Sequence, residues 1–156
     1  MSMEIERKYL VAGPYKHLAT HCHAVRQGYL TPPGNGWSVR VRMRDEEAFV
    51  TVKGPSADGG LSRPEFEWPI PPDEARQLID LCPTGPLEKR RWIVPWDGIT
   101  VEVDEFMGQN AGLTVAEIEL PHADAPVPKV PFLGDEVTGD TRYYNTSLCA
   151  HPFSEW

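Results

Sequence analysis

The fold of this chain is constrained most by a two-residue alternation of charged and apolar side chains, which recurs along nearly its whole length. The segment from Val39 to Arg44 is the clearest case, because every odd position is apolar and every even position is an arginine. Successive side chains of a strand point to opposite faces, so this pattern predicts strands with one charged face and one apolar face. The predicted strands cover residues 3–11, 22–31, 37–44, 47–54, 64–70, 86–95, 99–106 and 114–120.

Gly, Pro, Asn and Asp bound these segments, which is typical of antiparallel strands joined by turns. Turns at Pro32–Gly36 and Asp45–Glu47 predict a meander of the second, third and fourth strands. Because closure removes exposed sheet edges, we expect a mainly β (α+β) fold, a closed antiparallel barrel of about eight strands with a few short helices outside. Helices are expected after Pro14, from Asp73 to Leu81 and near Tyr144 to Ala150, and residues 121–131 are expected to be an extended surface segment.

The charged faces mostly carry like charges two residues apart. These are Glu4, Glu6 and Lys8 in the first strand, then Arg40 and Arg42, Glu65 and Glu67, Lys89 and Arg91, Glu102 and Asp104, and Glu117 and Glu119. A solvated sheet face explains any one strand, but neighbouring like charges cost up to ~1 kcal/mol, so it explains the whole set poorly. Divalent cations beside the acidic pairs and phosphates beside the basic pairs supply the missing counter-charge.

This charge pattern favours a barrel whose charged faces point inward. Unpaired buried charges are costly, so such an interior is expected to be a water-filled tunnel that holds a ligand. The apolar faces are then expected to pack beneath the short helices outside the barrel. The side chains expected in that outer layer include Phe66, Trp68, Trp92 and Ile118.

Length and composition limit the alternatives. The 156 residues, of which 40% are hydrophobic, predict a single domain spanning residues 1–156. A formal net charge of -8 argues against binding to nucleic acid or to an anionic membrane. Three widely spaced cysteines, no long apolar run and no leader-like N-terminus predict a cytoplasmic protein with reduced thiols. The sequence leaves open whether the protein is a monomer or a homodimer.

The ordered set of charged motifs resembles the CYTH superfamily, the triphosphate tunnel metalloenzymes. Glu4, Glu6 and Lys8 are similar to its E-x-E-x-K signature, and the later R-x-R, K-x-R and E-x-E strands follow in the family's order. The segment from Val137 to Asn145 resembles the tail of short bacterial members. The resemblance spans the chain and implies a closed β-barrel tunnel that holds a linear triphosphate.

The resemblance also implies residue roles. It places phosphate oxygens against Lys8, Arg40, Arg42, Lys53, Lys89 and Arg91. It places Mg2+ or Mn2+ against Glu4, Glu6, Glu117 and Glu119, and it leaves Glu65, Glu67, Glu102 and Asp104 to hold a second metal, orient a basic neighbour or activate water. Lys8, Tyr29 and Asp104 are the candidate catalytic residues, with Tyr29 expected to approach Lys8 from an adjoining strand as a proton-relay partner.

The implied activity is metal-dependent hydrolysis of a linear triphosphate, with inorganic triphosphate split to pyrophosphate and phosphate as the leading hypothesis. A class IV type adenylate cyclase and a thiamine triphosphatase are the alternatives among enzymes. A non-catalytic module that binds polyphosphate or a nucleotide is the alternative from another class.

Overall fold

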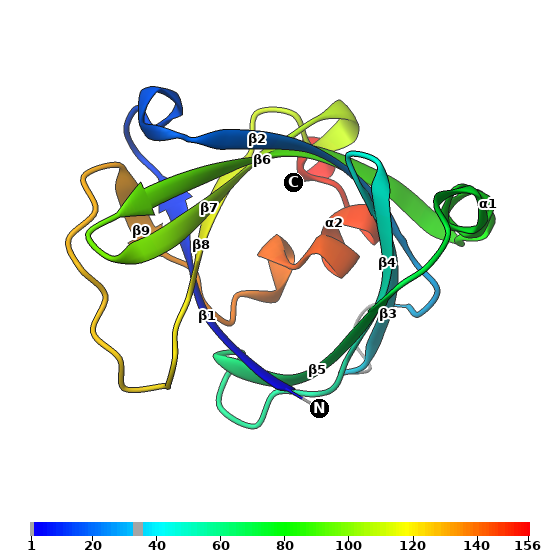
Figure 1. The fold of residues 1–156 in the computed structure, drawn as a ribbon, viewed down its shortest axis with the longest axis horizontal. Coiled ribbons are helices and arrows are strands. Elements are labelled where there is room, and N and C mark those ends of the chain that lie inside the picture. Colours follow the sequence, from blue (N-terminus) through cyan, green and yellow to red (C-terminus); the bar gives the residue numbers. More distant parts are fainter. Residues whose placement is uncertain (1, 33–35) are drawn as a thin grey trace.

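The computed structural model describes residues 2–32 and 36–156, and its strands form one antiparallel sheet that closes on itself (Figure 1). The strands are β1 (Ser2–Val11), β2 (His21–Tyr29), β3 (Ser38–Arg44), β4 (Glu47–Lys53), β5 (Ser62–Pro69), β6 (Thr84–Trp96), β7 (Ile99–Phe106), β8 (Thr114–Glu119) and β9 (Leu133–Glu136). Their order is β5-β4-β3-β2-β6-β7-β8-β1-β9, and an additional β5–β1 pairing joins the ends. Eight strands therefore form the barrel wall, and β9 lies beside β1.

The predicted barrel and its eight strands are confirmed, with ends that differ by no more than two residues. The helices are also found: η1 (Lys16–Leu18), α1 (Pro72–Leu81) and α2 (Asn145–Ala150). Short 3-10 turns η2 (Gly108–Asn110), η3 (Thr141–Tyr143) and η4 (Phe153–Glu155) complete the described elements. The prediction missed β9, and part of its first predicted turn, residues 33–35, lies outside the described residues.

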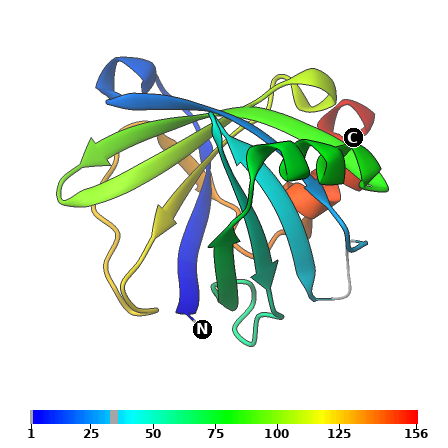
Figure 2. The same ribbon diagram turned by 45° about the vertical axis from the view of Figure 1, so that its right-hand side comes forward.

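Two apolar cores cover the outside of the barrel. One contains Val101, Ile118 and Phe132, and residues from η1 and from the extended segment 121–131 pack into it. The other lies between α1 and the sheet, where Val41 meets Ile79 (Figure 2). These two layers remove most outward apolar side chains of β3, β6, β7 and β8 from water and so stabilise the wall from outside.

A third apolar core lies inside the barrel, which corrects the expectation of a tunnel charged along its whole length. Leu87, Phe106 and Val115 occupy the same inward parity as the charged residues of β6, β7 and β8. They pack with Tyr143 of η3 and Leu148 of α2, and Figure 1 shows α2 within the ring of strands. One end of the interior is therefore dry and filled, and the charged part is a cavity rather than an open tube.

The outer face of β5 is also less covered than expected. Ile118 is fully buried and Trp92 packs against the same core, but Phe66 is 39% exposed and Trp68 is 48% exposed. No described helix lies over these two side chains, because α1 packs on β2, β3, β4 and β6 instead. Among the described helices none is both long enough and apolar enough to cross a membrane.

Candidate functional site

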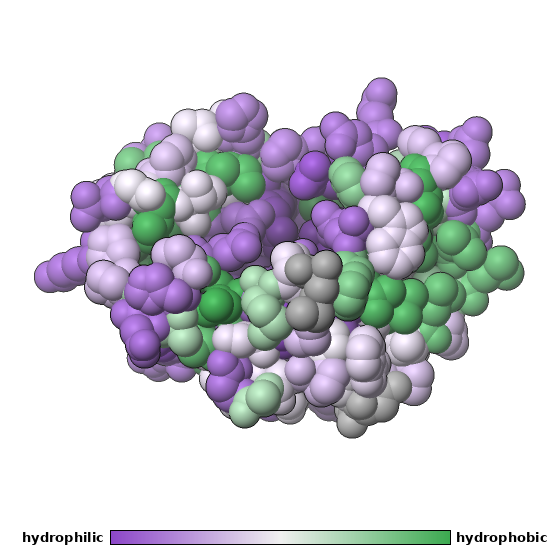
Figure 3. Space-filling model, turned by 60° about the horizontal axis from the view of Figure 1, so that its bottom comes forward, coloured by the Kyte–Doolittle hydropathy of each residue, from purple (hydrophilic) through white to green (hydrophobic). Residues whose placement is uncertain are grey.

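The open part of the barrel interior is a cavity of about 250 Å³. Its lining includes seven basic residues, Lys8, Arg40, Arg42, Arg44, Lys53, Arg63 and Arg91, and seven acidic residues, Glu4, Glu6, Glu65, Glu67, Glu102, Glu117 and Glu119. Figure 3 shows hydrophilic residues around a hollow on this side of the molecule. The structure thus brings together most of the residues that the sequence selected, although no one stretch of chain contains them.

Strand register explains why these side chains meet. Opposed residues of neighbouring antiparallel strands share a face. Lys8 is opposite Glu117, Arg40 is opposite Thr51, and Lys53 is opposite Glu65. A one-residue slip in any strand would send its charges to the outer face, where the apolar cores lie.

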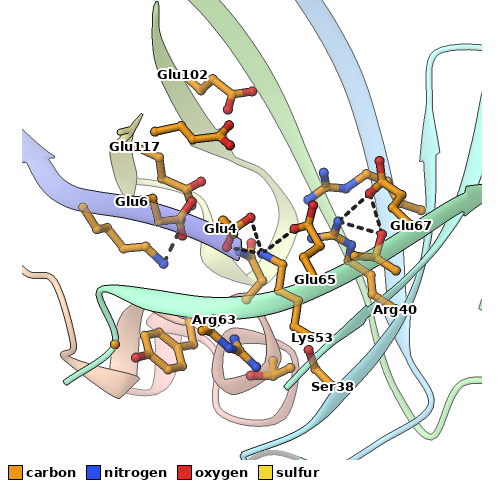
Figure 4. A pocket seen from close by; sticks show the side chains of 18 of the residues that line it. Glu4, Glu6, Ser38, Arg40, Lys53, Arg63, Glu65, Glu67, Glu102 and Glu117 are labelled. Carbon is orange, nitrogen blue, oxygen red and sulfur yellow. Dashed lines mark hydrogen bonds and ion pairs between the residues drawn. The ribbon is translucent and has the colours of Figure 1, made fainter. Parts of the chain in front are cut away.

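Arg40, Arg42 and Arg91 form what we call the basic wall of the cavity. Arg40 and Arg42 are only partly neutralised, although Figure 4 shows Glu67 close to Arg40. A terminal nitrogen of Arg40 donates a 3.0 Å hydrogen bond to Thr51 and lies 3.5 Å from Glu67. The Arg40 Nε is buried and has no hydrogen-bond partner among the described residues. Burial, together with the nearby Arg40 and Arg91, lowers the pKa of Arg42 to about 9. This wall therefore favours an anion, which would stabilise charges that the protein leaves uncompensated.

Lys53 links the basic wall to the acidic wall, which is formed by Glu4, Glu6, Glu117 and Glu119. Its ammonium donates to both carboxylate oxygens of Glu4, at 2.8 and 2.9 Å, and lies 3.7 Å from Glu65 (Figure 4). Burial raises the pKa of Glu4, but Lys53 and the hydrogen bond with Glu65 together outweigh that effect and hold the pKa below its usual value. Burial and the hydrogen bond with Glu4 raise the pKa of Glu65 to about 7.

The acidic wall contains a carboxyl group with too little counter-charge. Glu6 is half-buried, and burial together with Glu117 raises its pKa to about 8. Glu117 is buried as well, but Lys8 and Arg91 overcome the effect of burial and hold its pKa well below the usual range. Burial and Glu4 also raise the pKa of Glu119. Figure 4 shows Glu4, Glu6, Glu102 and Glu117 gathered on one side of the cavity.

Lys8 is held by the acidic wall and by the segment that closes the cavity. Its ammonium lies 3.7 Å from Glu117, donates to the Tyr143 carbonyl oxygen at 3.4 Å and sits 5.1 Å from the centre of the Tyr144 ring. Burial lowers the pKa of Lys8, but Glu117 and Glu6 more than reverse this and raise it above the usual value. Lys8 is therefore a cation at neutral pH.

The expected neighbourhood of Tyr29 is corrected. Its strand, β2, lies between β3 and β6, whereas Lys8 is on β1 and borders β8, β9 and β5. The two residues line the same cavity but do not lie on adjoining strands. The aromatic ring over Lys8 is that of Tyr144 instead. The signal for Tyr144 was present in the tail motif, where it stands directly before Asn145.

Lys89 and Asp104 do not line the cavity, although both were selected from the sequence. Asp104 is 1% exposed and accepts two hydrogen bonds from Arg91, at 2.8 and 2.9 Å, and one from Lys89 at 2.7 Å. Lys89 also donates to Asn145, and burial lowers the pKa of its ammonium. The two residues thus form a layer behind the wall that fixes Arg91, whose guanidinium also reaches Glu102 and Glu117.

The acidic wall fits a divalent metal ion by its chemistry. Mg2+ and Mn2+ prefer oxygen ligands, and Mg2+ often takes one or two protein carboxylates and fills its other positions with water and substrate phosphates. The raised pKa of Glu6 shows a carboxylate that a nearby cation would stabilise. No three His, Cys, Asp or Glu side chains in residues 2–32 and 36–156 are arranged as a ready metal site. The protein alone therefore supplies part of a coordination shell.

Sequence reasoning passed over several lining residues. Arg63 lines the opening, where its guanidinium donates to the carbonyl oxygens of Gly54 and Gly36. Thr138, Asn145 and Thr146 contribute from the segment around α2. Arg63 is on β5 and has the same inward parity as Glu65 and Glu67, so the two-residue alternation could have placed it on the inner face. Thr138, Asn145 and Thr146 belong to the tail and lack the alternation, so only the tail motif pointed toward them.

Comparison with known proteins agrees with this geometry. The model of the CYTH domain family matches residues 2–145. An inorganic triphosphatase of Acetivibrio thermocellus is 44% identical over 158 aligned positions, which cover 100% of this chain and 99% of that protein. An inorganic triphosphatase of Nitrosomonas europaea is 38% identical over 149 positions, covering 93% of this chain and 95% of that protein.

The fold is similar to that of a solved structure as well. A crystal structure of the inorganic triphosphatase NE1496 superposes with a TM-score of 0.68 at 34% identity and covers 96% of this chain and 95% of that one. The match of fold, charged cavity and sequence extends over almost the whole chain. The protein therefore belongs to the CYTH domain family.

Proposed function

We propose that this protein hydrolyses inorganic triphosphate to pyrophosphate and phosphate with the help of Mg2+ or Mn2+. Its relatives in Acetivibrio thermocellus and Nitrosomonas europaea are inorganic triphosphatases, and membership of the CYTH family implies a requirement for a divalent metal. The observation that carries the proposal is the charge balance of the cavity, whose described lining contains seven basic and seven acidic residues.

This balance explains why the substrate and the metal are needed together. A triphosphate alone would add several negative charges to a cavity that is formally neutral. A divalent cation alone would be repelled by the basic wall. The two together offset each other, with phosphates against the arginines and the metal against the glutamates.

On the basic wall, Arg40, Arg42 and Arg91 are assigned to phosphate oxygens, because a guanidinium can engage two oxygens at once. Lys53 and Lys8 act as point charges at the border with the acidic wall. Lys89 was grouped with these residues from the sequence. Since its ammonium is fully buried against Asp104, we assign it to the support of Arg91 rather than to direct contact with phosphate.

On the acidic wall, Glu4, Glu6, Glu117 and Glu119 are assigned to the metal, which, when bound, supplies Lewis-acid stabilisation of the phosphates and a more acidic water. Glu65, Glu67 and Glu102 each lie within 4 Å of a cation of the basic set, which favours an orienting role for them. Asp104 is a positioning residue for Arg91.

The reaction transfers a phosphoryl group to water, so placement of the phosphates and neutralisation of their charge supply most of the acceleration. Lys8 stays protonated beside Glu117 and can hold the phosphate that develops negative charge as the bond breaks. Tyr29 remains a candidate for hydrogen bonding to a phosphate from the opposite wall. Because β2 and β1 are not neighbours, we do not assign Tyr29 and Lys8 to a proton relay.

Release of phosphate from inorganic triphosphate tests the proposal, with ATP, thiamine triphosphate and pyrophosphate run beside it in Mg2+, Mn2+ and chelator. Metal-dependent release from inorganic triphosphate at the highest kcat/KM is the expected result. Cyclic AMP formation from ATP would identify a cyclase, and preferred cleavage of thiamine triphosphate would identify that activity. Tight binding of triphosphate without turnover would identify a binding module.

A matched pair of arginines separates the cavity from an ordinary charged surface. Arg40→Ala removes a cation from the cavity wall, whereas Arg26→Ala removes one from the outer face, where it pairs with Asp80 and Glu88. We expect Arg40→Ala to lower kcat/KM for triphosphate by on the order of a hundredfold, with Arg26→Ala near the parent value. Equal activity of the two variants would contradict the assignment of the cavity.

The setting of the enzyme is also proposed. The three cysteines form no disulfide in the structure, which supports the reducing cytoplasm as its compartment. We propose a monomer or a homodimer that acts on a small anion, without binding nucleic acid or membrane. Light scattering of the purified protein decides between the two oligomeric states.

A further inference from the structure

A glutamine inside the barrel connects two residues of the cavity wall. Gln27 lies on β2, opposite Arg42 on β3, and its side chain is fully buried. It does not itself line the cavity, whereas Arg42 and Tyr29 do. Its amide oxygen accepts a 2.9 Å hydrogen bond from the Arg42 Nε, and its amide nitrogen donates a 2.9 Å hydrogen bond to the Tyr29 hydroxyl.

The chemistry of these partners fixes the direction of both hydrogen bonds. A guanidinium has donors but no acceptor, so the atom of Gln27 that faces Arg42 must be its oxygen. The NH2 group of Gln27 therefore faces Tyr29, and the Tyr29 oxygen is the acceptor. Because the hydroxyl accepts from Gln27, its own proton is turned away from the amide, and Tyr29 is one of the residues that line the cavity.

The same hydrogen bonds orient Arg42. With the Nε bound to Gln27, the two terminal nitrogens of the guanidinium are left for the cavity. Arg42 makes no ion pair with any carboxylate of the described residues, in contrast to Arg40 and Arg91. A half-buried arginine without a carboxylate partner is stabilised by an anion, and here that anion would bind at the terminal nitrogens.

We propose that Gln27 is a positioning residue of the triphosphate site, which aims the terminal nitrogens of Arg42 and the hydroxyl proton of Tyr29 at the same phosphate group. This inference rests on the proposed function, since it identifies how that site is aligned. Gln27 contacts no substrate itself. Its contribution is to present two donors on neighbouring strands in fixed directions, so that neither needs to be ordered when the substrate binds.

The test is a double-mutant cycle on kcat/KM for triphosphate. Gln27→Met removes both hydrogen bonds while keeping a chain of similar length, and Tyr29→Phe removes the hydroxyl. We expect each single variant to lose on the order of tenfold, because each loses alignment of one or two donors. The double variant is expected to lose little more than the worse single variant, since the two residues act through one hydrogen bond. A double variant near the product of the two losses would overturn the inference.

A second variant separates alignment from packing. Gln27→Glu keeps an acceptor for Arg42 but has no amide donor, so the Tyr29 hydroxyl turns its proton toward the carboxylate and away from the cavity. We expect Gln27→Glu to lose at least as much kcat/KM as Gln27→Met. Parent-level activity of Gln27→Glu would refute the role. The control is Met43→Ala, a buried outward-facing change next to Arg42 that weakens the barrel without touching the cavity.

Stability and binding complete the experiment. Met43→Ala is expected to lower thermal stability and leave kcat/KM near the parent value, and an equal loss of kcat/KM there would assign the effect of Gln27 to general destabilisation. Calorimetric titration of the non-hydrolysable analogue imidotriphosphate in the presence of Mg2+ gives a readout without turnover, and Gln27→Met should bind it several-fold more weakly than the parent. If the parent protein binds but does not hydrolyse triphosphate, the proposed function fails while this binding comparison still tests Gln27. Equal binding in a hydrolytic parent and in Gln27→Met overturns the inference alone.

Discussion

Neutralising Glu6 should make the metal-free protein more stable. In the folded protein, burial and the neighbouring Glu117 raise the pKa of Glu6 from 4.5 to about 8. At ~1.4 kcal/mol per pKa unit, this shift corresponds to roughly 5 kcal/mol above pH 8. Glu6 is only half-buried and faces a cavity open to solvent, so screening by water reduces the expected gain of Glu6→Gln to about 2 kcal/mol.

The sign of this effect depends on pH. A carboxyl group whose folded pKa is raised binds protons more strongly in the folded state, so its ionisation destabilises the fold as pH rises from 4.5 toward 8. Glu6→Gln should therefore match the parent near pH 4.5, gain stability progressively up to about pH 8, and keep a constant gain above that. About 2 kcal/mol corresponds to a rise in Tm of roughly 6 °C for a domain of this size.

Thermal unfolding of parent and variant in chelator, from pH 4.5 to pH 9, measures this difference. Glu105→Gln is the matched control, because Glu105 is an outer carboxylate whose pKa is lowered by its hydrogen bond from Lys16, and its removal should give no gain. Added Mg2+ with triphosphate should stabilise the parent more than Glu6→Gln, which has lost a proposed ligand. A variant that is less stable than the parent at pH 8 in chelator would refute the description of the acidic wall.

Three further predictions concern the network behind the cavity, the apolar core at its closed end and the outer face of the barrel. Asp104→Asn leaves Arg91 and Lys89 without their shared carboxylate, so urea unfolding should show a loss of about 3 to 5 kcal/mol, and kcat/KM should fall; a loss below 1 kcal/mol would contradict the buried network. Leu148→Ala opens the apolar core at the closed end and should cost about 2 to 5 kcal/mol, which urea unfolding also measures. Trp68→Lys changes an exposed outer side chain and should shift the free energy of unfolding in urea by less than about 0.5 kcal/mol, so a larger loss would contradict the exposure of this face.

Sequence periodicity predicted most of the barrel because most strands have one face buried in an outer core, although the outer face of β5 is largely exposed. Inverted register would expose that core, so the alternation and the structure had to agree. The strand β9 was not predicted, because Leu133–Glu136 is only four residues long and its apolar and polar residues do not alternate. The apolar inner end was not predicted for a different reason. Leu87 and Phe106 have the same parity as charged residues, and parity gives the face of a residue but not its depth along the barrel.

The candidate site was predictable as a set but not in its detail. Parity along a strand placed Arg40, Glu65 and Glu117 on the inner face. It could not tell that Lys89 lies behind the wall, because depth along the barrel depends on stagger between strands. Nor could it find that Tyr29 and Lys8 are separated around the barrel, because the strand order β3-β2-β6 is set by long-range pairing.

The apolar packing at the end of the barrel that holds α2 affects how the substrate enters the cavity and how the products leave it. Because that end is filled, a substrate that enters from the open part of the cavity must release both fragments on the same side. The fragment nearer the open side must leave before the deeper one, so the direction in which the triphosphate enters also fixes the order of departure. Pyrophosphate lodged at the open side would then block the next turnover as well as the exit of phosphate.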